Sequence, residues 1–476
     1  MTRGLAVLRM EGEARVKTCS YHQGQGRQMS TMAQIQTSVR KHALRAMARV
    51  LPYVPEEWVF AVVRRWVDEI PYEAGRVFAR RLITFGRELM RRVSPNCRKK
   101  AIENFMINNY FAGLPKRRAL HTQLGCDAPY LIVVSPTMRC NLRCFGCYAG
   151  DYRKRDDLPR ELFEKALSDA RDLGVYFITI SGGEPFIRED LLDVFAKFDD
   201  QYFQVYTNGT LIDDALAREL AELGNVFPAI SVEGFEKETD ARRGKGTFKK
   251  ILAAMANLRR HGVPFAYSAT ATRLNNDLIV SDEFVDFWAE QGCFLGWYFN
   301  YIPIGYNPDP DLMPTPEQRV YRVKRLAELR RTRKILLADF WNDGPLVGGC
   351  MAAGKYYLHV NVRGDVEPCV FAHFAVDNIR DKSLRDILVS DFFKEIRARQ
   401  PFNDNHLRAC MIIDNPEVLR EVVGRCGARP THPNAESIIR DFAPRMDDYA
   451  RTYGRLADQC WQIYRGLDPE TDEPNA

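Results

Sequence analysis

Three cysteines stand close together in this chain, at Cys140, Cys144 and Cys147. Three thiolates on one short loop can hold three irons of a cubane 4Fe-4S cluster and leave the fourth iron free for a small molecule. A closed structural zinc site would need four protein ligands. The alternatives are a zinc site that lacks one ligand and a chance grouping of core cysteines. The polar neighbours Arg139 and Asn141 disfavour an apolar core segment.

A second segment with chemical potential is Ser181-Gly182-Gly183-Glu184-Pro185, which follows an apolar run at 176–180. Such a segment alone is typical of a simple turn before a helix. Here it lies one strand–helix unit after the cysteine loop, which itself follows an apolar run at 130–134. Both segments are therefore predicted to lie at the carboxyl ends of strands.

Together, the two segments resemble the radical S-adenosylmethionine (radical SAM) superfamily. The resemblance implies that Cys140, Cys144 and Cys147 bind a 4Fe-4S cluster. Its open iron would chelate the amino and carboxylate groups of SAM, and the cluster would supply the electron that cleaves the sulfonium C–S bond.

The resemblance also implies which residues hold SAM. Gly182, Gly183 and Glu184 would hold the methionine amino group, because glycines let backbone carbonyls approach a ligand without a Cβ in the way. The superfamily often has an aromatic residue directly before the third cysteine, beside the adenine. Gly146 takes that place here, and Tyr148 is the neighbouring aromatic candidate for the cofactor site.

The fourth predicted strand ends in Ser231-Val232-Glu233-Gly234 and is followed by Arg242 and Arg243. This resembles the superfamily's Ser-x-Asp-Gly segment with its downstream arginine, although Glu233 replaces the usual Asp. The resemblance implies that Ser231 and Glu233 face the ribose and carboxylate region of SAM. Arg242 or Arg243 would pair with the SAM carboxylate, which suits a bidentate guanidinium. The alternative is a capping turn followed by a surface arginine. Further candidates to line the cleft are Thr207-Asn208-Gly209, Ser268 and Thr270.

A second cysteine pattern has the spacing C-x13-G-x4-C, from Cys350 through Gly364 to Cys369. It resembles the auxiliary-cluster segment of the SPASM and twitch subgroup. A full SPASM domain continues with a dense set of cysteines, whereas this chain offers Cys410 and Cys426. We therefore predict one auxiliary 4Fe-4S cluster with these four cysteines as ligands. Core cysteines without metal and a zinc site are the alternatives.

Alternating β-rich runs and amphipathic helical stretches lie between 126 and 335. This pattern predicts parallel strands with right-handed crossovers, in six units rather than the eight of a closed TIM barrel. We predict an α/β fold with a partial (β/α)6 TIM-like barrel, an N-terminal helical region and a small loop-rich C-terminal cluster domain. The expected parts are a disordered tail (1–32), a basic amphipathic helical region (33–125), the radical SAM core barrel (126–335), a SPASM/twitch-like auxiliary cluster domain (336–436) and a C-terminal helix and tail (437–476).

The length of 476 residues suits two or three domains. No uncharged apolar run approaches the ~18 residues that cross a bilayer, and Met1–Met10 lacks a signal-peptide core. The twelve cysteines therefore fit a reducing compartment, where clustered cysteines bind metal rather than form disulfides. We expect a cytoplasmic protein.

Positive charge is concentrated between Gln34 and Arg118, where 18 Lys and Arg residues stand against 7 Asp and Glu residues. One interpretation is a helical cap that packs on the barrel and keeps a solvated basic face. The other is peripheral contact with an anionic membrane surface, at the inner membrane face. No recognition motif accompanies the charge, so no nucleic-acid partner is expected.

The resemblance implies a radical SAM enzyme of the oxidoreductase or transferase type. It would cleave SAM to a 5′-deoxyadenosyl radical that abstracts hydrogen from an unactivated carbon, with a flavodoxin or ferredoxin as electron donor. The basic, aromatic N-terminal helices favour a lipid or other membrane-borne substrate. The alternatives are a ribosomal-peptide maturase of the SPASM type and a non-catalytic iron–sulfur redox protein. No catalytic side chain is assigned.

Overall fold

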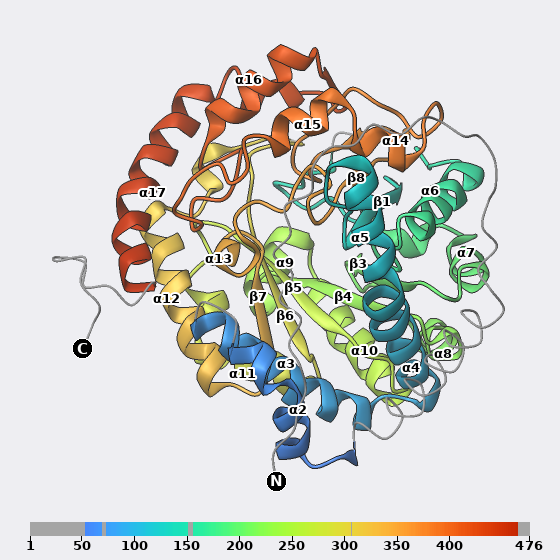
Figure 1. Cartoon of the computed structure of the whole chain (residues 1–476). Coiled ribbons are helices and arrows are strands. Elements are labelled where there is room, and N and C mark those ends of the chain that lie inside the picture. Colours follow the sequence, from blue (N-terminus) through green and yellow to red (C-terminus); the bar gives the residue numbers. More distant parts are fainter. Residues whose placement is uncertain (1–52, 69–72, 151–155, 306, 465–476) are drawn as a thin grey trace, which may run out of the picture. The chain divides into compact units, whose positions relative to one another are not determined.

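A parallel β-sheet forms the centre of the computed structural model, which describes residues 53–68, 73–150, 156–305 and 307–464 (Figure 1). The strand order is β7-β6-β5-β4-β3-β2-β1-β8-β9. The first seven strands are all parallel, and β8 pairs in parallel with β1. Their bounds are β1 (Leu131–Thr137), β2 (Phe177–Gly182), β3 (Tyr202–Thr207), β4 (Val226–Val232), β5 (Ala266–Ala271), β6 (Leu295–Asn300) and β7 (Leu336–Asp339).

Amphipathic helices connect these strands and cover the outer face of the sheet. In α6 (Arg160–Asp172), the buried residues are Phe163, Ala166, Leu167 and Ala170, which form one stripe at helical spacing. The other connecting helices are α7 (Leu191–Lys197), α8 (Asp214–Leu223), α9 (Glu236–Arg243), α10 (Thr247–Arg260), α11 (Asp282–Glu290) and α12 (Pro316–Thr332). The predicted partial TIM-like barrel is confirmed.

Beyond β6, the sheet continues with one parallel strand more than the six predicted from the sequence. Strand β7 pairs with β6 in register from Leu295 opposite Leu336, and all four of its residues are buried. The sequence prediction placed this segment in the cluster domain. A four-residue apolar run has no periodicity that separates a buried strand from a loop.

The N-terminal helices close the barrel at the amino ends of its strands. Phe85 and Ala101 share a hydrophobic cluster with Tyr202, Phe227 and Leu336, each at the start of a strand. Helix α3 also packs on α12 and β7. The elements of this region are α2 (Glu56–Asp68), α3 (Glu73–Arg92), α4 (Pro95–Lys100), the π-helix η2 (Ala101–Ala112) and α5 (Gly113–Leu124). The described part of the basic region is therefore a helical cap. The tail predicted over 1–32 lies outside the described residues.

The C-terminal part continues the central sheet. Strands β8 (His359–Val360) and β9 (Val366–Glu367) form an antiparallel hairpin beside β1. Gly364 lies between them with φ +81°, in the left-handed region that favours glycine. The remaining elements are α13 (Gly344–Val347), β10 (Phe374–Ala375), α14 (Leu384–Leu388), α15 (Asp391–Arg397), α16 (Pro416–Cys426), β11 (Arg429–Pro430) and α17 (Ala443–Tyr464). Among the described residues, no helix has the length and apolar character needed to span a membrane.

Candidate active site

The cysteine loop follows β1 at the carboxyl end of the sheet. Its three thiols are electrostatic neighbours: burial raises the pKa of Cys140 to about 11, and Glu184, Cys144 and Cys147 each add to the rise. The Leu142 N–H donates to Cys140 Sγ at 3.4 Å. In the absence of a cation, these surroundings favour the neutral thiol over the thiolate. They therefore suit a positively charged iron centre, which would stabilise the thiolates.

The three cysteines of the loop match the donor set that a cubane cluster requires. Among the described side chains, no group of three or more His, Cys, Asp or Glu could hold one metal ion together. The cysteines of a cubane cluster each bind a different iron, so they need not converge on one point.

The Gly-Gly-Glu segment is locked against the cysteine loop through backbone hydrogen bonds. Gly183 N–H donates to Thr137 O at 2.9 Å, and Glu184 N–H donates to Arg139 O at 2.8 Å. A Cβ at Gly183 would lie 2.2 Å from Arg139 O, and one at Gly182 would lie 2.3 Å from Thr137 O. Only glycine permits this close approach of the two loops.

Glu184 is fully buried at the end of β2 and is held by three donors. Its carboxylate accepts hydrogen bonds from Thr207 Oγ1 at 2.7 Å, Asn208 N at 2.7 Å and Phe186 N at 3.2 Å. Burial raises its pKa to about 7, although these three bonds favour the charged form. The Asn208 side chain also lies 3.9 Å from Cys140 Sγ. The end of β3 therefore supports both Glu184 and the cysteine loop.

Tyr148 joins the cysteine loop to β2 and to the C-terminal part. Its hydroxyl group forms a hydrogen bond with Ser181 Oγ at 2.5 Å and accepts one from Gly182 N at 3.4 Å. Burial raises the pKa of Tyr148 to about 12. Its ring lies 5.6 Å from that of Phe371 and 6.5 Å from that of His373, centroid to centroid. Tyr148 thus lies between the two cysteine sites.

Glu233 binds both of the arginines that the sequence suggested for the SAM carboxylate. Arg242 Nη1 lies 2.6 Å from one carboxylate oxygen and Arg243 Nη2 lies 2.5 Å from the other. Arg242 Nε also donates to Phe145 O at 3.2 Å. In this structure Arg242 therefore contacts the cysteine loop directly, while Glu233 pairs with both guanidinium groups. Ser231, the other residue proposed here, is half-buried on β4 opposite Ser268.

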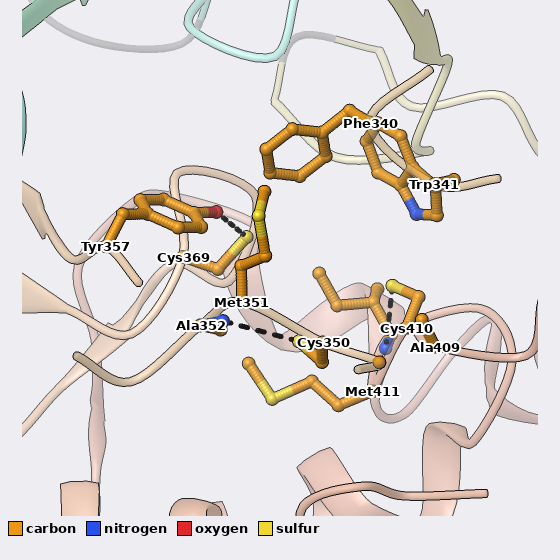
Figure 2. Close-up of a pocket in the computed structure, with 12 residues that line it drawn as sticks. Phe340, Trp341, Cys350, Met351, Ala352, Tyr357, Cys369, Ala409, Cys410 and Met411 are labelled. Carbon is orange, nitrogen blue, oxygen red and sulfur yellow. Dashed lines mark hydrogen bonds between the residues drawn. The ribbon is translucent and has the colours of Figure 1, made fainter. Parts of the chain in front are cut away.

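Cys350, Cys369 and Cys410 line a single cavity in the C-terminal part (Figure 2). Each thiol accepts a hydrogen bond from the backbone N–H two residues later, at 3.5, 3.5 and 3.3 Å respectively. Cys140 accepts the same kind of bond from Leu142. Hydrogen bonds to sulfur are one means by which proteins tune iron–sulfur clusters. The Tyr357 hydroxyl adds a further bond to Cys369 Sγ at 2.7 Å. These three cysteines therefore fit an auxiliary cluster.

The structure does not bring Cys426 to this cavity. Cys426 is the last residue of α16 and does not line the cavity. Its charged neighbours include Glu395, Asp391 and Arg399, from α15 and the turn after it. Three of the four cysteines predicted as auxiliary ligands are thus brought together. The spacing of the cysteines alone could not reveal that Cys426 lies elsewhere, because spacing does not show where the last residue of a helix lies in the fold.

Comparison with known proteins decides the family. The radical SAM superfamily model matches residues 134–277, and the iron-sulfur cluster-binding domain model (SPASM) matches residues 350–411. The chain is 33% identical over 305 residues to mycofactocin maturase MftC of Mycolicibacterium smegmatis. The aligned region covers 58% of this chain and 74% of that protein. The chain belongs to the radical SAM superfamily.

A second relative agrees with this assignment to the radical SAM superfamily, and one solved structure has a similar fold. PqqA peptide cyclase of Rhizobium meliloti is 27% identical over 285 residues, covering 54% of this chain and 73% of that protein. The crystal structure of Streptococcus suis SuiB bound to S-adenosylmethionine shares the fold, with a TM-score of 0.52 and 20% identity over 63% of this chain and 76% of that one.

The protein is therefore a radical SAM enzyme whose cofactors are a 4Fe-4S cluster, SAM and an auxiliary iron–sulfur centre. When bound, the first cluster supplies the electron for reductive cleavage of SAM. The hydrogen bonds around Glu184 and the ion pairs of Glu233 position the surrounding loops.

A buried ion pair missed by the sequence analysis anchors the auxiliary cavity. Arg319 Nη1 lies 2.6 Å from Asp414 Oδ1, and both side chains are fully buried. Asp414 Oδ2 accepts the Cys410 N–H at 3.0 Å, while the Arg319 guanidinium lies 3.6 Å from the ring centroid of Tyr453. The pair thus connects α12 and α17 to the Cys410 loop. In the sequence, the feature that could have indicated this ion pair was the position of Asp414 four residues after Cys410.

We expect Asp414→Asn to lower the free energy of unfolding by about 3–5 kcal/mol, because it leaves the buried Arg319 charge without its partner. Urea unfolding of the purified protein measures this effect. Asp311→Asn is the matched control, since its ion pair with Arg445 is exposed and should contribute at most about 1 kcal/mol. Equal unfolding midpoints for the two variants would contradict the expected role of the Arg319–Asp414 pair.

Proposed function

We propose that this radical SAM enzyme modifies a ribosomally made precursor peptide by abstracting hydrogen from an unactivated carbon. The observation that carries the proposal is its relationship to a maturase, MftC, at 33% identity over 74% of that protein. A second relative is named as a peptide cyclase. The SPASM match at 350–411 agrees with this class of substrate. The peptide-maturase alternative from the sequence is thus better supported than the prediction of a lipid substrate.

The structure removes part of the reason for a lipid substrate. The lipid prediction was based on the apolar and basic faces of the N-terminal helices. Phe85 of α3 is buried against strand starts inside the barrel end, so this part of the apolar stripe is used within the protein. A lipid substrate remains an outcome that the deuterium-transfer experiment described next can detect.

Hydrogen abstraction offers a direct test of the substrate class. Reconstituted enzyme is incubated with SAM, a reductant and either the deuterated peptide fraction or the deuterated lipid fraction of its native host. Abstraction of deuterium from a substrate carbon places deuterium in the 5′-deoxyadenosine product, which mass spectrometry detects. We expect labelling from the peptide fraction alone. Labelling from the lipid fraction alone would overturn the peptide proposal in favour of the lipid reading.

Glu184 is proposed, with Gly182 and Gly183, to hold the amino group of SAM. Its carboxylate already accepts three hydrogen bonds at the mouth of the cysteine loop. The buried group needs a further donor to stabilise its charge, and an amino N–H of SAM supplies one. Ser231 is proposed to face the ribose. Because Arg242 and Arg243 are already paired with Glu233, these three residues are proposed to act on SAM by positioning the cysteine loop.

This role for Glu184 predicts that the affinity for SAM depends on pH. Because the pKa of Glu184 is raised to about 7, its carboxylate is protonated below that pH and deprotonated above it. Affinity should therefore rise with pH and level off above about 7, with about a tenfold difference between pH 6 and pH 8. Calorimetric titration of SAM into the reconstituted enzyme measures this difference. The Glu184→Gln variant should lose the pH dependence of SAM affinity that the Glu184 carboxylate causes. A pH profile in that variant equal to that of the wild type would contradict the role proposed for Glu184.

A further inference from the structure

We propose that Tyr301 is a positioning residue of the SAM site, because its ring supports the cysteine loop at Gly146, between Cys144 and Cys147. Tyr301 directly follows β6 and lies far from this loop in the sequence. Neither the cysteine spacing nor the Gly-Gly-Glu segment pointed to it. The inference concerns the SAM site alone, and it does not depend on whether the substrate is a peptide.

The first argument is the contact between Tyr301 and Gly146. Gly146 has φ +65°, in the left-handed region that favours glycine. A Cβ at Gly146 would lie 2.7 Å from Cε2 of the Tyr301 ring. The ring therefore occupies the space into which a side chain at position 146 would extend. The loop lacks an aromatic side chain at this position, and the end of β6 supplies an aromatic ring there instead.

The second argument is a further contact of the same segment, at Gly305. This glycine has φ +81°, and a Cβ on it would lie 2.5 Å from Cys147 O and 2.4 Å from Tyr148 O. The segment 301–305 thus contacts the cysteine loop twice, once through the Tyr301 ring and once through its own backbone. Each segment has a glycine where the other approaches, so neither can shift toward the other without a clash.

The third argument is that Tyr301 is itself fixed at both ends. Its backbone N–H donates to Ala271 O, at the end of β5, at 2.9 Å. Its hydroxyl oxygen accepts a hydrogen bond from the Asp309 N–H at 2.9 Å. Only 2% of the residue is exposed, so no face of the ring is open to a ligand. Tyr301 therefore acts on the SAM site through the loop that it supports.

Two other aromatic side chains of the loop region make different contacts. The Tyr148 hydroxyl group bonds to Ser181 Oγ at 2.5 Å. The Phe145 ring is 41% exposed and lies 6.0 Å from the Arg242 guanidinium. Support at the glycine between the second and third cysteines thus comes from the β6 segment. A shift of this loop by about 1 Å would displace two of its three thiols and lower binding or rate by about 100-fold.

The position of the loop is tested on the metal-free, full-length protein with iodoacetamide, which alkylates accessible thiols. The new Cβ of Gly146→Ala would press on the Tyr301 ring and move the loop. Cys144 and Cys147 should then react at least about threefold faster than in the wild type, because exposure controls the reactivity of a thiol. Mass spectrometry of the digested protein measures each rate. Wild-type rates at both thiols would overturn the proposal.

Gly125→Ala is the matched control for the backbone conformation. Gly125 also has φ +65°, but a Cβ there meets nothing within 4 Å, so the two loop thiols should react at the wild-type rate. Cys97 and Cys126 serve as internal references, because they belong to neither cysteine site. A faster reaction at the references as well as at the loop thiols in Gly146→Ala would show general loosening of the fold and would overturn a local role.

A double-mutant cycle on SAM affinity, measured by calorimetry with the reconstituted enzyme, isolates the contact between the two residues. Tyr301→Ala removes the support and should weaken SAM binding about tenfold, whereas Gly146→Ala should weaken it about 100-fold through the clash. Because the clash disappears with the ring, the double variant should bind SAM much more tightly than the about 1000-fold loss that two independent effects would give. Losses that multiply would contradict the proposed contact.

Two further variants of Tyr301 complete the test. Tyr301→Phe keeps the ring and loses only the bond from the Asp309 N–H, so it should bind SAM within about threefold of the wild type. A larger loss would place the effect in the hydroxyl group and overturn the role of the ring. If Tyr301→Ala does not fold, Tyr301→Leu takes its place in the cycle, because leucine fills the buried space but lacks the Cε2 atom nearest to Gly146.

Discussion

Replacement of Cys140 by alanine will abolish reductive cleavage of SAM by this protein. The loop supplies three thiols, and Cys140 is the one that interacts with both the Leu142 N–H and the Asn208 side chain. Two remaining thiols leave a second iron without a protein ligand. We expect 5′-deoxyadenosine formation under dithionite to fall at least about 10³-fold, which is the scale of losing a chemically obligatory group.

The matched control for this experiment is Cys126→Ala. Cys126 is a half-buried free thiol that belongs to neither cysteine site, so its variant should keep the iron content and activity of the wild type. Cys140→Ala should retain the iron of the auxiliary cluster alone. Full SAM cleavage by Cys140→Ala would show that the loop does not hold the catalytic cluster.

The sequence predicted those features that depend on local spacing. Cys140, Cys144 and Cys147 lie within eight residues, so their proximity needs no knowledge of the fold. The strand runs between 126 and 335 are long enough to show alternation with helices. The cysteine loop and the Gly-Gly-Glu segment carried the resemblance to the family, and the alternation predicted the parallel barrel; both are confirmed.

Features that depend on contacts between distant segments could not be predicted. Cys426 is separated from Cys410 by a helix whose orientation decides where its last residue lies. The pairing of Glu233 with Arg242 and Arg243 needed the geometry of the turn after β4. The Arg319–Asp414 pair joins residues 95 positions apart. Sequence spacing places Asp414 four residues after Cys410, but it does not show which distant side chain Asp414 contacts.

The same limit explains the reading of the N-terminal helices. An amphipathic basic helix has the same residue pattern whether its apolar stripe contacts a membrane or another part of the protein. For Phe85 the structure distinguishes the two possibilities, because this side chain is buried among residues at the beginning of the barrel strands. It leaves Trp58 and Leu82 exposed, with 68% and 48% of their surfaces accessible. Burial within the chain is thus the information that the pattern lacked.

The second large effect is expected for Gly183→Ala, a change of one methyl group. The new Cβ would lie 2.2 Å from the carbonyl oxygen of Arg139. Glu184 N–H donates to that same oxygen, so the clash forces the segment away from the cysteine loop by about 1 Å. A displacement of this size at a positioning element lowers binding or rate by about 100-fold. Overpacking should also lower the free energy of unfolding by about 1–3 kcal/mol.

Calorimetric titration of SAM and urea unfolding separate the two consequences of Gly183→Ala. Gly424→Ala is the matched control, because Gly424 lies within α16 and a Cβ there meets nothing within 4 Å. Removing a glycine from a helix interior should stabilise the protein by about 0.5–1 kcal/mol and leave SAM binding unchanged. If Gly183→Ala binds SAM as tightly as Gly424→Ala, the close contact between the two loops is not needed to hold the cofactor. The alternative result is weaker SAM binding with an unfolding free energy near that of the wild type. That result would show that the substitution acts on the geometry of the SAM site, as the contact between Gly183 and Arg139 predicts.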